Sequence, residues 1–71
     1  MEQLDICVRF GRNVRTVRRS KDVSQEELAE KADLHRTYIS ALERGRGRNP
    51  SIRVAHRIAV ALGVSLGSLF E

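Results

Sequence analysis

Arginine is the residue of this sequence best suited to bind a charged ligand, because its planar guanidinium forms paired hydrogen bonds with phosphates and base edges. Six arginines and a single acid, Glu43, lie within residues 36–57, whereas residues 24–35 carry one lysine and four acids. The formal charge of +4 over 71 residues is therefore divided into blocks. The basic block indicates an anionic partner such as a nucleic acid.

Cys7, His35 and His56 are the residues that could ligate a metal or assist catalysis. Their spacing matches neither Cys-x-x-Cys nor His-x-x-x-His, and the sequence contains no Ser-His-acid or Gly-rich phosphate motif. Cys7 fits the apolar side of the first expected helix, where a buried thiol is inert. We therefore expect no enzyme activity, no metal site and no cofactor.

The length of 71 residues allows one domain, residues 1–71, and too little buried surface for an enclosed substrate cavity. The longest apolar run, residues 58–62, is far shorter than a membrane span. A single cysteine favours a reducing compartment, so we expect a cytoplasmic protein without a membrane partner. Three aromatic residues are few for stacking single-stranded bases.

Helical spacing of apolar residues predicts a compact all-α domain of five helices and no strand. The first helix is expected over residues 3–21, with an apolar stripe and a separate set of arginines. The stripe comprises Leu4, Cys7, Phe10, Val14 and Val17, and the arginines outside it are Arg9, Arg12, Arg15 and Arg19. Gly11 lies inside this helix and weakens its propensity.

Capping residues define the remaining expected helices. Ser24 and Glu27 form a capping-box pattern at the start of the second helix, and the third is expected over residues 35–44 before Gly45. Residues 45–50 read as a loop, because they include two glycines and one proline. Ser51 is expected to cap a fourth helix that ends at Gly63; its apolar positions are Ile52, Ala55, Ile58, Ala59 and Leu62. A short fifth helix follows from Ser65.

The stretch from Ser24 to Gly45 resembles the Cro/C1-type (lambda-repressor-like) helix-turn-helix family. The shared signature is Ser-Gln-Glu-Glu-Leu-Ala at 24–29 together with Ile-x-x-Leu-Glu-x-Gly at 39–45, and the likeness extends over about residues 8–70. Arg-Thr-Tyr-Ile-Ser at 36–40 most resembles the small controller proteins of restriction–modification systems. The loop between Glu43 and Asn49 is one residue longer than that resemblance implies and fits phage repressors instead.

The resemblance implies that the third helix enters the DNA major groove with its amino end first. The base-reading residues would be Arg36, Thr37, Ser40 and Ala41. The residues implied to bind phosphates are Gln25, Tyr38, Arg44, Arg46, Arg48 and Asn49. The alternatives are a solvated charge or a phosphate contact for Arg36, a solvent-facing amide for Gln25 and a place at the core edge for Tyr38.

Two further roles follow from the resemblance. Arg18 and Glu43 align with a buried ion pair that ties the first helix to the third. Glu26 and Glu30, four residues apart, match an acidic patch with which related regulators touch the sigma subunit of RNA polymerase. The alternative for these two acids is a solvated helix face that complements the helix dipole.

Dimerisation is expected because one short recognition helix reads only a few base pairs. The carboxy-terminal helix would form the interface through Val64, Leu66, Leu69 and Phe70. The function implied is a homodimeric regulator of transcription that binds a palindromic operator in double-stranded DNA, most like a restriction–modification controller. A phage-type repressor, an antitoxin-like autorepressor, a protein–protein adaptor and an RNA-binding protein remain as alternatives.

Overall fold

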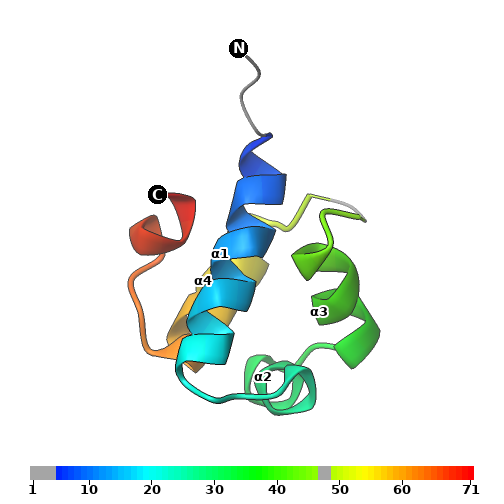
Figure 1. The fold of residues 1–71 in the computed structure, drawn as a ribbon. Helices are drawn as coiled ribbons and strands as arrows, with labels where there is room; N and C mark the ends of the chain where they lie inside the picture. Colours follow the sequence, from blue (N-terminus) through cyan, green and yellow to red (C-terminus); the bar gives the residue numbers. More distant parts are fainter. Residues whose placement is uncertain (1–4, 47–48) are drawn as a thin grey trace.

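A computed structural model describes residues 5–46 and 49–71. Over these residues the chain forms four α-helices and one 3₁₀ helix: α1 (Ile6–Ser20), α2 (Gln25–Ala32), α3 (Arg36–Glu43), α4 (Ile52–Leu62) and η1 (Gly67–Phe70). The described part contains no strand. In Figure 1, α1 lies in front of α4, with α3 on one side, η1 on the other and α2 beneath. The predicted all-α class is confirmed, whereas the fifth element is a single 3₁₀ turn.

The first helix starts later than residue 3 because Asp5 caps it. The Asp5 Oδ1 atom accepts a hydrogen bond of 2.8 Å from the Cys7 backbone N–H, so the helix begins at Ile6. Leu4, which was expected in the apolar stripe, lies outside the described residues. Lys21 follows the last helical residue as the C-cap.

The second and fourth helices begin where their serine caps predict. Ser24 Oγ accepts from the Glu27 N–H at 3.0 Å, and Glu27 Oε1 accepts from the Ser24 N–H at 2.9 Å, which completes the capping box. Ser51 Oγ accepts from the Val54 N–H at 3.0 Å. Each bond satisfies a backbone donor that the first helical turn leaves free.

The third helix is shorter than predicted at both ends. His35 is its N-cap residue, without a side-chain capping bond, and Arg44 is its C-cap residue. Gly45 follows with a φ of +72°, a left-handed conformation that glycine adopts without strain. The turn between α2 and α3 depends on Asp33, a non-glycine residue with a φ of +58°.

The last element is a 3₁₀ helix because its bonds span three residues. The Ser68 N–H donates to the Ser65 carbonyl at 3.2 Å, and the Leu69 N–H donates to the Leu66 carbonyl at 3.1 Å. The element η1 has only four residues and stays a 3₁₀ helix throughout.

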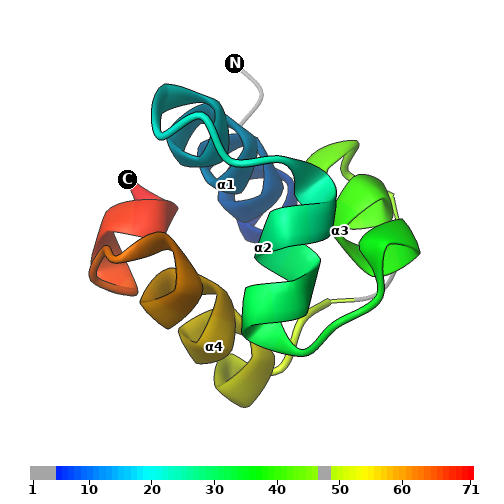
Figure 2. The ribbon, with the colours of Figure 1, turned by 90° about the horizontal axis from the view of Figure 1, so that it is seen from below.

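The core lies between α1, α2, α3 and α4 and is closed by η1 (Figure 2). Its six largest fully buried side chains are Phe10, Val14, Leu28, Ile39, Ile58 and Leu69. The Phe10 ring stacks on Phe70 with centroids 5.0 Å apart, which attaches η1 to α1. Cys7 was expected in this core, but the structure leaves it half-exposed. Desolvation, together with the nearby Asp5 carboxylate, raises the pKa of its thiol.

Candidate nucleic-acid interface

The face of α3 that points away from the core carries the residues that were predicted to read bases. Arg36 and Thr37 are exposed and Ser40 and Ala41 are half-buried, whereas Ile39 and Leu42 lie in the core. Residues three and four apart in a helix share a face. The four predicted base-reading residues therefore lie on one accessible surface, in the first two turns of the helix.

Glu43 fixes the far end of α3 to α1 through a buried pair. The Arg18 Nε atom lies 2.6 Å from Glu43 Oε2, and Arg18 Nη2 donates to Glu43 Oε1 at 2.9 Å, so two parallel hydrogen bonds join the helices. Arg18 Nη1 also donates to the Val23 carbonyl at 2.8 Å. The bonds to Glu43 raise the pKa of Arg18. This is the ion pair that the family resemblance implies.

Gln25 belongs to the same network. Its side-chain amide is therefore not directed only at solvent. Its Nε2 atom donates to Glu43 Oε1 at 3.1 Å, and the residue is half-buried. The start of α2, the end of α3 and α1 are thus joined at one carboxylate. A phosphate contact by Gln25 remains a prediction, which would use the part of the amide that Glu43 leaves free.

Tyr38 lies at the edge of the core, packed partly against the buried residues. Burial, with a smaller effect from Cys7, raises the pKa of its phenol, so the hydroxyl stays protonated at neutral pH. A protonated hydroxyl is able to donate to a phosphate. Both predicted roles of Tyr38 are therefore compatible with its position.

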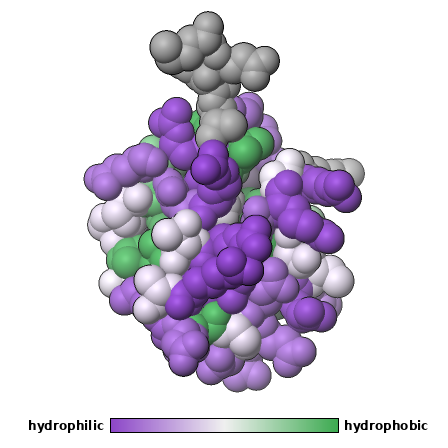
Figure 3. Space-filling model, in the orientation of Figure 1, coloured by the Kyte–Doolittle hydropathy of each residue, from purple (hydrophilic) through white to green (hydrophobic). Residues whose placement is uncertain are grey.

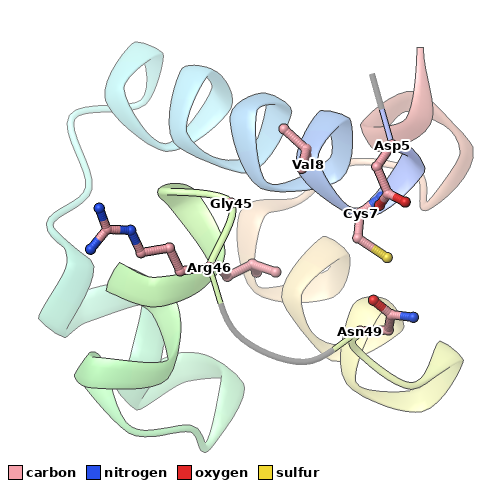
Figure 4. Close-up of a pocket in the computed structure, with 7 residues that line it drawn as sticks. Asp5, Cys7, Val8, Gly45, Arg46 and Asn49 are labelled. Carbon is pink, nitrogen blue, oxygen red and sulfur yellow. The ribbon is translucent and has the colours of Figure 1, made fainter. Parts of the chain in front are cut away.

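The loop after α3 supplies further positive charge. Arg44, Arg46 and Asn49 are exposed, and Arg48 lies outside the described residues. A hollow of about 210 Å³ separates the loop from the start of α1 and is lined by Asp5, Cys7, Val8, Leu42, Gly45, Arg46 and Asn49. Figure 4 shows the Arg46 guanidinium extending away from Asp5 and Cys7. The charge of Arg46 is therefore available to a ligand outside the fold.

Arg57 has a role within the fold that the sequence did not reveal. Its Nε and Nη2 atoms donate to the Ala32 carbonyl at 2.9 and 2.6 Å, and Nη2 also donates to the Asp33 carbonyl. These carbonyls end α2, where a cation complements the helix dipole. One arginine of the basic block thus attaches α4 to the turn that precedes α3.

Replacing Arg57 with methionine should lower the free energy of unfolding by about 1–2 kcal/mol, because two carbonyls lose charged donors at a site that water reaches in part. Urea unfolding measures this change. Arg53→Met is the matched control, since Arg53 is exposed on the same helix. Equal stability of the two variants would contradict a stabilising role for Arg57.

The acids of α2 fall into two groups. Glu27 closes the capping box, and the hydrogen bond from the Ser24 N–H holds the pKa of its carboxyl below the ordinary value. Glu26 and Glu30 are exposed, four residues apart on one side of the helix, and no ion pair engages them among the described residues. They are accessible to a partner, as the predicted polymerase contact requires.

The predicted dimer residues do not all reach the surface. Leu69 is 0% exposed, because η1 turns it into the core of its own protomer, so it cannot contact a partner. Val64, Leu66 and Phe70 are half-buried. The prediction for Leu69 is therefore wrong, and its role is to support η1 from beneath.

Ile52 is the largest departure from the predicted core. The sequence placed it on the inner face of the fourth helix, yet it is 82% exposed, and Ile6 is 58% exposed. Both border an apolar groove of about 370 Å³, whose lining is Ile6, Cys7, Phe10, Pro50, Ile52, Ala55, Leu66 and Phe70. Two of the predicted dimer residues, Leu66 and Phe70, belong to this groove.

Comparison with known proteins places this geometry in a family. The helix-turn-helix family model matches residues 14–69. The chain is 48% identical to the control protein C.BamHI of Bacillus amyloliquefaciens over 68 residues, which cover 94% of this chain and 83% of that protein.

Solved structures share the fold. The restriction–modification controller protein C.AhdI from Aeromonas hydrophila superposes with a TM-score of 0.85 at 39% identity, covering 90% of this chain and 96% of that one. The biofilm regulator SinR, solved in complex with DNA, gives a TM-score of 0.82 at 35% identity over 87% of this chain and 98% of that one. This chain belongs to the Cro/C1-type helix-turn-helix family, as its signature at residues 24–45 predicts.

Proposed function

We propose that this protein is a sequence-specific regulator of transcription that places α3 in the major groove of double-stranded DNA. The observation that supports this most is the exposed face of α3, with Arg36 and Thr37 at its amino end, on a helix whose other end is fixed by a buried ion pair. The likeness to SinR, which is solved in complex with DNA, supports DNA as the ligand.

The side chains of this face suit base edges. Arg36 would form two hydrogen bonds with guanine O6 and N7, a contact that discriminates by about 1–3 kcal/mol. Thr37 combines a hydroxyl with a methyl group that packs on thymine, and Ser40 bonds to any of several bases. Ala41 offers an apolar contact at the edge of this set.

Contacts with phosphates would position this face. Arg44, Arg46 and Asn49 are exposed beyond the carboxyl end of α3, and Gln25, at the start of α2, is joined to that same end through Glu43. Arg48, next in the loop, is assigned the same role from the sequence. Such contacts fix the register of the protein on DNA without reading the sequence.

Binding to a random-sequence duplex at increasing salt concentration tests this function. The logarithm of the affinity should fall linearly with the logarithm of the salt concentration, because each neutralised phosphate releases counterions. A folded protein that retards no duplex at low salt would instead be an adaptor. Tighter binding to single-stranded RNA than to duplex DNA would favour the RNA-binding alternative.

We also propose that two copies of the chain associate through the apolar groove beside η1. The groove joins the start of α1 and the start of α4 to Leu66 and Phe70, and exposed Ile6 and Ile52 border it. One recognition helix makes too few contacts for tight binding, and a twofold dimer would set two of them about 34 Å apart.

Ile52→Glu should convert the dimer to a monomer at high micromolar concentration, because the charge would be buried against the second copy. Sedimentation equilibrium gives the mass. Val60→Glu is the matched control: Val60 is 64% exposed on α4 but does not line the groove, so that variant should stay dimeric. A monomeric wild-type protein would contradict the proposed dimer. Dissociation of both variants would show that the interface is not confined to this groove.

The regulatory role closest to the observations is that of a restriction–modification controller. The identities with C.BamHI and C.AhdI support it, and a methyltransferase or endonuclease gene beside this one would strengthen it.

Exposed Glu26 and Glu30 are proposed to touch RNA polymerase when the protein activates transcription. Glu30→Lys should then bind the operator normally and fail to activate; unchanged activation would leave those acids as a solvated face.

A further inference from the structure

The outer face of α1 carries positive charge that the contacts described so far do not use. Its arginines outside the core are Arg9, Arg12, Arg15 and Arg19; the last three are exposed and Arg9 is half-buried. None of the four forms an ion pair or a side-chain hydrogen bond among the described residues. Hydrophilic side chains cover this side of the molecule, over α1 (Figure 3).

The edge of this face that adjoins α3 carries Arg15. Gly11, one turn earlier on the same side of the helix, abuts the backbone of Leu42 and Glu43. Arg18, close by, forms the ion pair with Glu43. Arg15 is therefore next to the contact between α1 and α3, on its solvent side.

Arg19 lies one turn beyond Arg15 on α1, close to the start of α2. It lines a hollow of about 320 Å³ together with Arg18, Asp22, Val23, Ser24 and Glu27. Of the two acids there, Glu27 is engaged by the Ser24 N–H, and Asp22 is exposed. Gln25, which follows Ser24, begins the part of α2 that is proposed to meet a phosphate.

The opposite edge of α1 faces η1. The Asn13 side chain donates to the carbonyls of Leu69 and Glu71 at 2.8 and 3.1 Å. Arg9, one turn before Asn13, lies on this same edge. Helical geometry turns it about 120° away from Arg15 around the axis of α1, on the side of η1 and not of α3.

We propose that Arg15 and Arg19 bind phosphates of the DNA backbone beside the one met by the start of α2, so that the binding surface of each protomer extends from α3 across α1. This inference rests on the proposed function. A duplex fits this edge better than an acidic protein does, because the edge lacks the apolar centre of a protein interface and continues the surface of α2 and α3.

The salt dependence of binding to an operator duplex, obtained by selection from a random pool, tests the two arginines one at a time. Arg15→Gln and Arg19→Gln should each remove one phosphate contact per protomer, or two per dimer. The slope of log affinity against log salt should then become shallower by about 1.8 for each variant. When the salt rises from 50 to 200 mM, the affinity of each variant should therefore fall by a factor about twelve times smaller than the factor for the wild-type protein.

Arg9→Gln is the matched control, with the same change of charge on the other edge of α1, and its slope should equal that of the wild type. Wild-type slopes for Arg15→Gln and Arg19→Gln would overturn the inference while leaving the proposed function intact. Equal reductions in all three variants would also overturn it, because they would show a general effect of net charge. Failure of the wild-type protein to bind any duplex would refute the proposed function itself.

Discussion

Glu43→Ala should lower the free energy of unfolding by about 3–5 kcal/mol, because it leaves the Arg18 guanidinium buried without its partner. Arg18 is 9% exposed and Glu43 is 4% exposed, so the guanidinium would lose its partner at a largely buried position. The substitution also removes the acceptor of the Gln25 amide. A domain of this size has a total stability of about 4–11 kcal/mol, so the loss would be a large fraction of the whole. Thermal melting followed by circular dichroism measures this loss.

A double variant separates the ion pair from other effects of position 43. Arg18→Met combined with Glu43→Leu removes both charges and keeps most of the volume, so it should recover most of the lost stability. If the double variant melts as low as Glu43→Ala, the loss does not come from an unpaired charge. If Glu43→Ala melts like the wild-type protein, the pair contributes nothing.

Gly11→Ala should destabilise the protein by about 1–3 kcal/mol, although alanine is the better helix former by about 1 kcal/mol. A Cβ atom at position 11 would lie 2.0 Å from the Leu42 carbonyl oxygen and 2.9 Å from its carbon. Both are backbone atoms, so the two helices must move apart, and Glu43 would be displaced from Arg18. The close contact therefore outweighs helix propensity.

Urea unfolding of Gly11→Ala gives the sign of the effect. Gly67→Ala is the control, because a Cβ atom there would meet nothing within 4 Å and its φ is not left-handed. That variant should lie within about 0.5 kcal/mol of the wild-type protein. A stabilised Gly11→Ala would mean that α1 and α3 do not approach as closely as the structure has them.

Local patterns in the sequence predicted much of the fold. The caps at Ser24 and Ser51 are local devices, since their partners lie three residues away, and both appear as expected. Helix propensity alone marks Gly11 as a weak point in a helix. Its reason is a contact with residue 42, and such a contact depends on packing rather than on neighbouring residues.

The burial of two apolar residues, Leu69 and Ile52, shows a second limit of sequence patterns. Leu69 and Ile52 are both large and apolar at helical spacing, but Leu69 is fully buried and Ile52 is 82% exposed. The spacing of apolar residues does not predict which of them are buried within one chain and which stay exposed for a partner. The Arg18–Glu43 pair was implied by the family resemblance, since nothing local joins residues 25 positions apart.

Arg57 shows why an arginine count overstates the ligand surface. Its charge is directed at the end of α2, where it stabilises the turn before α3. The face of α3 and the loop residues Arg44 and Arg46 remain exposed, as does the edge of α1 that carries Arg15 and Arg19. The placement of each arginine, and not the net charge, decides where DNA would lie.

Selection of bound duplexes from a random pool tests the central claim most directly, namely that exposed residues of α3 read bases. The wild-type protein should enrich two related half-sites with twofold symmetry and centres about 34 Å apart. Arg36→Ala, selected in parallel, should fold normally and lose the preference for guanine at one position of each half-site. A pool that stays random after repeated rounds with folded, DNA-binding protein would contradict the claim, as would an unchanged consensus with Arg36→Ala.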